Sequence, residues 1–186
     1  MAVGTVSALM VLSDLERAHE VAAALNGHGI SDISFVESTH DAINCMVERR
    51  YGLIFVDARV PVTLGGETIL YGGVDFIRFV RMCKPPVCKA TVAFIRNHVG
   101  SVSLIESRAD VMDAHDAGVD CVLTYPVTDE KVAQVVLPEL AIPRPFLRTE
   151  TYIGPCRRRR NKAFSAERRH AAIPSDSRPA RSRVAR

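Results

Sequence analysis

Short apolar runs and amphipathic stretches alternate along the first part of the chain, up to about residue 140. Five runs rich in aliphatic and β-branched residues predict β-strands, at residues 6–12, 33–38, 52–57, 90–95 and 121–125. The intervening stretches repeat apolar residues every three or four positions and predict helices, at residues 14–26, 39–50, 74–82, 103–117 and 128–140. Thr128 is the expected N-cap of the last helix.

This alternation predicts the fold class. Strands that are apolar throughout are buried on both faces, and helices between them imply right-handed crossovers and a parallel sheet. We therefore expect an α/β fold, a five-stranded parallel (βα)5 sandwich of the flavodoxin-like kind. Binding sites in such folds lie beyond the carboxyl ends of the strands. The polar residues expected at that edge are Ser13, Asp14, Asp57, Arg96, Asn97 and Tyr125, followed by Pro126.

Charge divides the chain into two parts. Residues 1–140 hold 11 Lys/Arg and 18 Asp/Glu, a net charge of −7, whereas residues 141–186 hold 13 Lys/Arg and 3 Asp/Glu, a net charge of +10. The second part is also polar and rich in proline, and it is too short for a second core. We expect a globular domain over residues 1–140 and a basic tail over residues 141–186, largely disordered or ordered by a ligand.

The five cysteines are scattered and form no CxxC pair, and the histidines show no zinc-ligand spacing. This pattern is typical of reduced thiols in the cytoplasm. No apolar run approaches the roughly 20 residues of a membrane helix. The opening run leads directly into an acidic helix start, so it is interpreted as a buried strand and not as a signal sequence.

Three segments resemble the response-regulator receiver domain of bacterial two-component signalling. They read "ALMVLSD", "GLIFVDARVP" and "AGVDCVLTYP", in that order, within residues 6–140. The resemblance implies that Asp57 is the phospho-accepting aspartate and that Asp14, with Asp57, holds Mg²⁺. It also implies a histidine kinase as a partner.

The same positions depart from the receiver pattern. Ser13 stands where the family has an acidic residue, Tyr125 where it has a lysine, and Arg96 where it has a switch hydroxyl. Phosphoryl transfer to a carboxylate needs a divalent cation and a fixed positive charge. Two interpretations of Asp14 and Asp57 therefore stay open: a working phosphorylation site, or remnants that cap a strand and a helix start. The segments 62–73 and 97–104 exceed a minimal receiver and are either surface insertions or docking elements.

The basic tail is almost purely arginine, with only one lysine, Lys162. Guanidinium groups bind phosphate and the guanine edge in bidentate fashion and stack on purines, so arginine favours recognition beyond simple charge attraction. Gly154-Pro155 is expected to turn the chain so that the arginines on both sides converge. The candidate nucleotide-binding residues are Arg144, Arg148, Tyr152, Gly154, Pro155, Arg157, Arg158, Arg159, Arg160, Arg168 and Arg169.

The tail also resembles the arginine-rich extension of the Cle group of CheY-like proteins. The residues that carry this resemblance are Tyr152, Gly154-Pro155 and the arginines that follow. It implies binding of cyclic di-GMP and action on the flagellar motor. The residue after Gly-Pro is usually acidic in that group and is Cys156 here, so the contact to the guanine base is expected to differ.

The leading hypothesis is a non-catalytic cyclic di-GMP effector in which the tail binds the nucleotide and the receiver-like domain docks a partner such as a flagellar switch component. One alternative is a phospho-switch that uses Asp57. Another is an adaptor that binds nucleic acid or anionic membranes through an unselective basic tail, although no specific DNA binding is expected.

Overall fold

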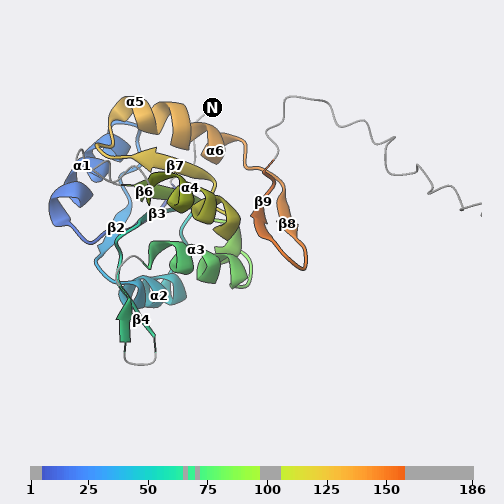
Figure 1. Ribbon diagram of the computed structural model, residues 1–186. Helices are drawn as coiled ribbons and strands as arrows, with labels where there is room; N and C mark the ends of the chain where they lie inside the picture. The colour runs from blue at the N-terminus through green and yellow to red at the C-terminus, as the bar shows by residue number, and fades with distance from the viewer. Residues whose placement is uncertain (1–5, 65–66, 70–71, 97–105, 158–186) are drawn as a thin grey trace, which may run out of the picture.

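The computed structural model describes residues 6–64, 67–69, 72–96 and 106–157 of the chain. Its centre is a five-stranded sheet of order β2-β1-β3-β6-β7, in which every neighbouring pair is parallel (Figure 1). The strands are β1 (Ala8–Val11), β2 (Ile33–Val36), β3 (Leu53–Asp57), β6 (Thr91–Arg96) and β7 (Cys121–Thr124). The predicted α/β fold and all five of its strands are confirmed.

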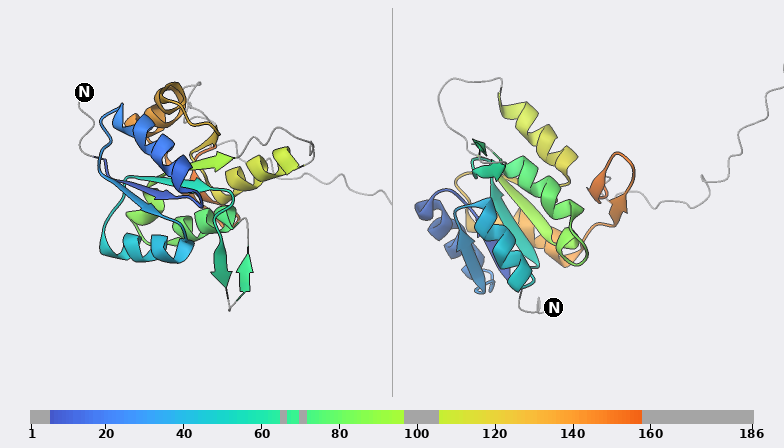
Figure 2. Two further views of the ribbon diagram at one scale, coloured as in Figure 1. Left: turned by 90° about the vertical axis from the view of Figure 1, so that its left-hand side faces the viewer. Right: turned by 90° about the horizontal axis from the view of Figure 1, so that it is seen from below.

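Two layers of helices cover the sheet (Figure 2). The helices are α1 (Leu15–Asn26), α2 (Thr39–Glu48), α3 (Gly73–Met82), α4 (Glu106–Ala117) and a last helix made of α5 (Asp129–Lys131), the π-helical segment η2 (Val132–Val136) and α6 (Leu137–Ala141). Helix α1 and the last helix pack on one face, whereas α2, α3 and α4 pack on the other. Alternate residues of each strand enter the two cores, as Met10 and Val11 of β1 do.

Helix starts follow the sequence signals. Asp14 is the N-cap of α1 and accepts a hydrogen bond from the Glu16 amide at 2.9 Å. Ser38 caps α2 in the same way, with the Asp41 amide at 3.1 Å. Thr128 caps the last helix, as predicted, through the Lys131 amide at 3.4 Å. Such caps satisfy amides that have no partner inside the helix.

The structure adds short elements that the hydrophobic pattern did not predict. The segment 62–73 contains an antiparallel pair, β4 (Val62–Leu64) and β5 (Glu67–Ile69), and a 3-10 turn covers Val87–Lys89. A second antiparallel pair, β8 (Phe146–Arg148) and β9 (Ile153–Pro155), follows the last helix. Three-residue strands are too short to show a period of two. The segment 97–104 and the first residues of the predicted helix 103–117 lie outside the described residues.

The β8–β9 hairpin extends the folded part of the chain beyond the boundary predicted near residue 140. Strand β9 packs against α3. Arg144, in the loop before β8, donates to the Cys156 carbonyl just after β9 and to the Asp120 carbonyl just before β7, and so links the hairpin to the domain. The hairpin lies beside the starts of β6 and β7, which is the amino edge of the sheet. Asp57 ends β3 at the opposite, carboxyl edge.

Candidate functional site

Asp57 sits at the carboxyl edge and is completely buried, with 0% of its surface exposed. One carboxylate oxygen accepts a hydrogen bond from the Arg59 amide at 3.0 Å. The other accepts from Nη1 of Arg17 at 3.4 Å. At the predicted phosphoacceptor position, both carboxylate oxygens of the aspartate therefore have partners within the chain.

The guanidinium of Arg17 lies at the centre of this edge. Its Nε is 3.4 Å from Oδ2 of Asp14, and its Cζ is 4.8 Å from the centre of the Tyr125 ring. Arg17 thus connects the start of α1, the end of β3 and the residue after β7. The pKa of Tyr125 is raised, first by a hydrogen bond with Glu20, so the phenol stays neutral beside this cluster.

These residues do not fit a divalent cation. Mg²⁺ needs near-octahedral oxygen ligands at about 2.1 Å. Asp14 and Asp57, the predicted ligands, instead share one guanidinium, and Ser13 offers no carboxylate. Within the ranges given above, no group of three or more His, Cys, Asp or Glu side chains is placed to hold a metal ion. Arg96 contributes its backbone to β6; its side chain lies outside what the structure describes.

The second candidate region is the hairpin at the amino edge. Its turn is closed by the Thr149 amide, which donates to the Tyr152 carbonyl at 2.9 Å, and by the Thr149 hydroxyl, which accepts from the Tyr152 amide at 3.0 Å. The prediction that Gly154-Pro155 forms the turn is therefore wrong, since both residues belong to strand β9. The turn falls earlier because the Thr149 hydroxyl supplies a local partner for the backbone.

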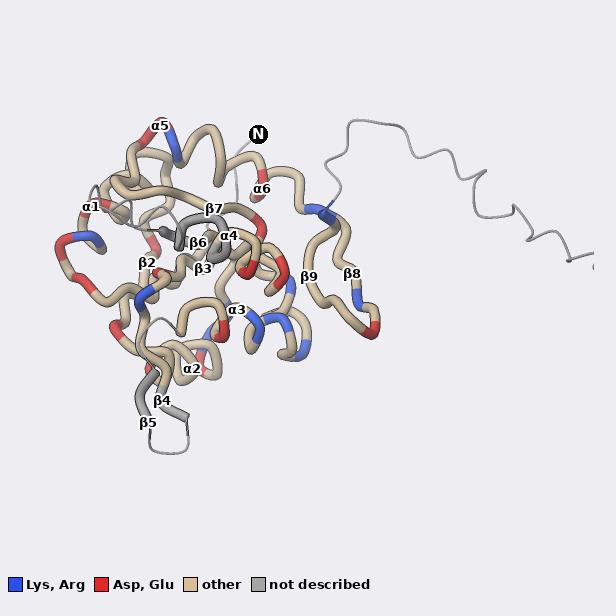
Figure 3. The backbone as a smooth tube through the Cα atoms, viewed as in Figure 1, with Lys and Arg blue, Asp and Glu red and all other residues tan. Residues whose placement is uncertain are grey.

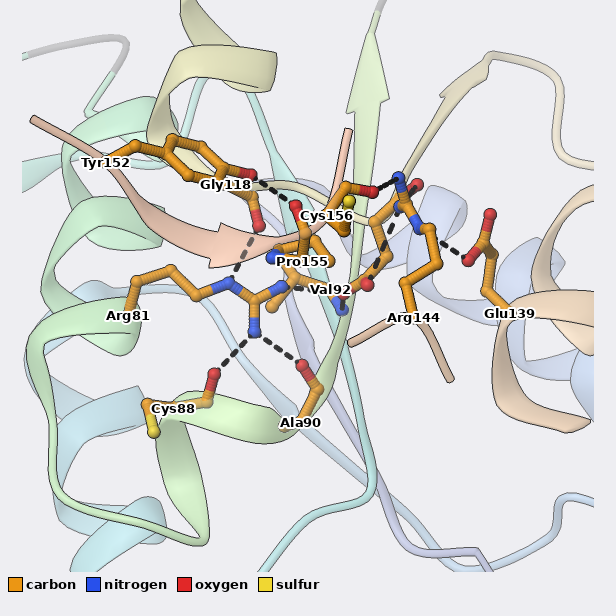
Figure 4. Close-up of polar contacts among 11 residues, drawn as sticks. Arg81, Cys88, Ala90, Val92, Gly118, Glu139, Arg144, Tyr152, Pro155 and Cys156 are labelled. Carbon is orange, nitrogen blue, oxygen red and sulfur yellow. Dashed lines mark hydrogen bonds and ion pairs between the residues drawn. The ribbon is translucent and has the colours of Figure 1, made fainter. Parts of the chain in front are cut away.

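The surface of the domain on which the hairpin lies, called the hairpin seat below, is organised around Arg81 of α3 (Figure 4). The Arg81 residue is 2% exposed. Its Nε donates to the Gly118 carbonyl at 2.7 Å, and Nη1 donates to the carbonyls of Cys88 and Ala90 at 2.8 and 2.7 Å. Its Nη2 pairs with Asp120 at 2.6 Å. A buried guanidinium thus satisfies three carbonyls and one carboxylate where helices and strands end.

Arg144 extends the same network from the loop before β8 (Figure 4). Its Nε pairs with Glu139 at 3.0 Å, its Nη1 donates to the Cys156 carbonyl at 3.3 Å, and its Nη2 donates to the Asp120 carbonyl. The side chain is 12% exposed. Arg144 was predicted as a nucleotide ligand, but here all three of its nitrogens are engaged inside the fold.

Two glycines let the hairpin approach the domain closely. Gly118 ends α4 with a φ of +93°, and a Cβ there would lie 2.6 Å from the Ile153 carbonyl oxygen. A Cβ on Gly154 would lie 2.8 Å from the Cα of Gly118. Gly154 and the buried Pro155 therefore position the hairpin. The hydroxyl of Tyr152 donates to the Pro155 carbonyl at 2.7 Å and holds the tyrosine ring over strand β9.

An arginine and an aromatic ring contact each other where the end of the hairpin meets helix α4. Cζ of Arg157 lies 4.2 Å from the centre of the Tyr152 ring, and its Nη2 lies 2.8 Å from a carboxylate oxygen of Asp116 on α4. Arg157 is about half exposed, and Arg148 of β8 is exposed. Figure 3 shows basic residues on β8 and where the hairpin joins the domain, an acidic residue at the hairpin tip, and acidic residues on the neighbouring helix α4. The remaining predicted arginines, residues 158–160 and 168–169, lie outside the described residues.

A cavity of about 190 Å³ lies between the hairpin and the amino edge. Its lining consists of Arg81, Lys89, Thr91, Asp120, Pro143, Arg144, Phe146 and Pro155. Pattern reasoning missed Arg81, Gly118 and Asp120. The available signal was an arginine four positions after Ile77 on the apolar face of α3, a place where a charged residue needs a buried partner.

Burial also sets the chemistry of Cys121 at the start of β7. The thiol is 6% exposed, and desolvation, with a smaller contribution from Asp120, raises its pKa to about 12. The same cause, burial, raises the pKa of Cys83. These cysteines stay protonated and unreactive near neutral pH. The cysteines that the structure describes are all free.

Searches with protein-family models and among curated proteins give no match. Solved structures do match, and response regulators and receiver domains are among them. A two-component response regulator from Clostridium difficile shares 18% identity over 74% of this chain and 97% of its own, with a TM-score of 0.55. The chemotaxis response regulator CheY4 of Vibrio cholerae shares 17% identity over 73% and 98%, with a TM-score of 0.55.

A third neighbour bears on the carboxyl edge. It is the receiver domain of a sensor histidine kinase from Pseudomonas aeruginosa, with a magnesium ion coordinated in its active-site cleft. It shares 16% identity over 75% of this chain and 100% of its own, with a TM-score of 0.57. At such identities the likeness establishes the fold, and this chain has the receiver, or CheY-like, fold. No helix among the described residues is long and apolar enough to span a membrane.

Proposed function

We propose that this protein is a non-catalytic signalling effector that binds cyclic di-GMP through its arginine-rich tail. The observation that carries the proposal is the Tyr152–Arg157 pair, stacked at 4.2 Å on the hairpin at the point where the run of four arginines begins. The receiver-fold domain serves as the platform from which the hairpin presents this pair.

The chemistry of the pair suits a guanine nucleotide. A guanidinium stacked on an aromatic ring is held flat, and a purine can stack on the same surface. Its remaining N–H groups can donate to guanine O6 and N7 or to phosphate. The arginines that follow in the sequence supply further charge for the two phosphates of a cyclic dinucleotide. Arg148 is exposed on β8 and completes the candidate contacts on the described part of the tail.

The geometry divides the predicted residues into two groups. Arg144, Gly154 and Pro155 hold the hairpin on the domain, and Arg144 has no nitrogen left without a partner. Tyr152, which is partly buried, and Arg157, which is about half exposed, are the two residues proposed to touch the ligand. Hydrogen bonds and close backbone contacts within the chain hold residues 146–157 on the domain, and this fixes where the proposed ligand contacts stand.

The proposed output is docking of a protein partner, such as a flagellar motor switch component. A nucleotide held beside α4 neutralises arginines and creates a new surface formed jointly by ligand and domain. The resemblance to the Cle group supports this partner, and the chemotaxis response regulator from Vibrio cholerae among the structural neighbours is in keeping with it. Fold alone does not specify function, so the proposal of a motor partner holds only if the protein binds cyclic di-GMP in the test below.

The test is calorimetric titration of cyclic di-GMP, with GTP as the competitor, into the full-length protein. Arg157→Ala is expected to weaken binding by about tenfold or more, the effect of losing one charge-assisted hydrogen bond. Arg50→Ala is the matched control, because Arg50 is an exposed arginine after α2, away from the hairpin. Tyr152→Leu removes the stacking ring, whereas Tyr152→Phe keeps the ring and removes only the hydroxyl.

Selective binding that falls in Arg157→Ala and Tyr152→Leu but persists in Arg50→Ala supports the proposal. Equal binding of cyclic di-GMP, GTP and single-stranded nucleic acid, with a steep loss on adding salt, would instead identify an unselective polycation. No binding by the folded protein would overturn the proposal.

A further inference from the structure

The carboxyl edge contains an arrangement that the proposed function does not use. Asp57 is fully buried, yet the cation beside it belongs to the chain: it is Arg17, held between Asp57, Asp14 and the ring of Tyr125. We propose that Arg17 is a built-in cation that takes the place of a divalent metal, so that the edge is a permanent ionic cluster and accepts no Mg²⁺. This inference is independent of cyclic di-GMP binding.

Distances show that one guanidinium serves both acids. Nη1 lies 3.4 Å from Asp57, and Nε lies 3.4 Å from Asp14, so different nitrogens face different carboxylates. A metal bridging Asp14 and Asp57 would have to occupy the space that the guanidinium fills. It would also meet the positive charge of Arg17 at a few ångströms, where like charges repel strongly at a partly buried site.

Packing keeps Arg17 in this position. Its side chain is 19% exposed and starts from the first turn of α1, whose orientation is set by the Asp14 cap. The aromatic face of Tyr125, 4.8 Å from Cζ, favours the flat guanidinium on a third side. A lysine at position 125 would place a second cation against Arg17, so an aromatic residue there is consistent with an arginine in the centre.

The cluster also limits what can happen at Asp57. A divalent cation that neutralises the phosphoryl oxygens is part of the usual chemistry of phosphoryl transfer. Here the residues present do not fit such a cation, and both oxygens of Asp57 already accept hydrogen bonds. We therefore expect no Mg²⁺-dependent labelling of Asp57 by a small phosphodonor. Regulation of this domain would then arise at the amino edge, where the tail begins.

The decisive experiment measures Mn²⁺ binding to the full-length protein by electron paramagnetic resonance. Mn²⁺ takes the same oxygen ligands as Mg²⁺ and can be observed directly. The wild type and the single variant Asp57→Asn should bind Mn²⁺ equally weakly. In Ser13→Asp/Arg17→Ala, which removes the cation and adds a carboxylate, Mn²⁺ affinity should rise about tenfold or more and should fall back when Asp57→Asn is added.

Two results would overturn the inference. One is Mn²⁺ bound by the wild type and lost in Asp57→Asn, because the metal would then share the site with Arg17 in place. The other is a folded Ser13→Asp/Arg17→Ala protein, verified by circular dichroism, with no gain in Mn²⁺ affinity. If that double variant does not fold, the wild-type comparison still decides, and Arg17→Gln replaces it as the variant expected to gain affinity.

Discussion

The two edges of the sheet each place an arginine against an aspartate, but they use it differently. At the carboxyl edge, Arg17 is partly exposed and meets Asp14 and Asp57 at 3.4 Å each. At the amino edge, Arg81 is buried and makes four hydrogen bonds of 2.6–2.8 Å. The first guanidinium neutralises acids that would otherwise repel each other. The second joins backbone carbonyls that no helix or strand satisfies.

This difference explains why the hairpin is attached where it is. The ends of α4, the 3-10 turn and the loop before β7 leave carbonyls inside the protein, and unpaired polar groups there are costly. Arg81 and Arg144 satisfy them and thereby create a seat for β8 and β9. These contacts, in turn, fix the orientation of Tyr152, which is partly buried, and of Arg157, which is about half exposed. Substitutions at the two edges are therefore expected to differ in their effect on stability.

Removing Arg81 should have the largest effect. Arg81→Met keeps apolar volume but leaves three buried carbonyls without the donor that Arg81 supplies, and it removes one of the partners of Asp120, which keeps the Val92 amide and Arg144. We expect a loss of about 3–5 kcal/mol in the free energy of unfolding. The measurement is chemical denaturation followed by circular dichroism. The matched control is Arg78→Met on the same helix, whose exposed pair with Asp75 should contribute less than about 1 kcal/mol. Equal losses in the two variants would contradict the buried-seat account.

Adding a side chain at Gly118, where the domain and the hairpin approach most closely, should have the second-largest effect on stability. Gly118→Ala introduces a Cβ at positive φ that overlaps the Ile153 carbonyl, and we expect a loss of about 3 kcal/mol with faster proteolysis of the hairpin. Gly29→Ala is the control, because Gly29 has a φ of +78° but open space around it. It should cost only about 1 kcal/mol. A difference near zero between the variants would show that the hairpin does not need the close approach.

At the carboxyl edge the informative quantity is the coupling between Arg17 and Asp57. A double-mutant cycle of Arg17→Ala and Asp57→Asn should give a coupling energy of about 1–2 kcal/mol, smaller than the effect of Arg81 because Arg17 is partly exposed. The exposed pair Arg49 and Asp32 is the control cycle and should give well under about 1 kcal/mol. Thermal and chemical unfolding would measure both. Equal coupling energies in the two cycles would show that Arg17 and Asp57 interact no more strongly than an exposed surface pair.

Burial of the Cys121 thiol at the amino edge should make the stability of the protein depend on pH. Its pKa is about 12 in the folded protein against an ordinary 9.0, so the folded state holds the proton more strongly. Its contribution to stability is therefore complete below about pH 9 and is lost as the pH rises toward about 12. Near pH 10 we expect a loss of roughly 1 kcal/mol from this group. Cys121→Ala should remove that part of the pH dependence, and an unchanged profile would contradict a buried thiol.

The smallest effect is expected for the exposed pair between Asp116 and Arg157. Asp116→Asn should change stability by less than about 0.5 kcal/mol, since both side chains are about half exposed. It frees Arg157 from a competing carboxylate, so cyclic di-GMP affinity should rise slightly in the titration described above. Asp113→Asn, one turn earlier on α4, is the control. Weaker nucleotide binding in Asp116→Asn alone would assign Asp116 to the ligand contacts.

Much of this molecule could be predicted from local sequence. The five strands, the helices between them and the cap at Thr128 all follow from signals within a few residues, and the structure confirms them. Asp14, predicted at the start of the first helix, is its N-cap. The concentration of arginine after residue 141 is likewise a property of the sequence alone. These features depend on hydrophobic periodicity and on backbone amides that seek a nearby partner.

Tertiary structure decided the rest, because the partners lie far apart in the chain. Arg17 and Asp57 are 40 positions apart, and Arg81 reaches Gly118 across 37. No local signal shows that an arginine in the apolar face of α3 will support a hairpin, or that Gly154-Pro155 belongs to a strand and not to a turn. Local patterns in the sequence predict the five strands of the sheet and the helices between them, but not the two short antiparallel pairs. Only the tertiary structure decides which charged groups are buried together, because the sheet brings residues that are distant in the sequence to the same edge.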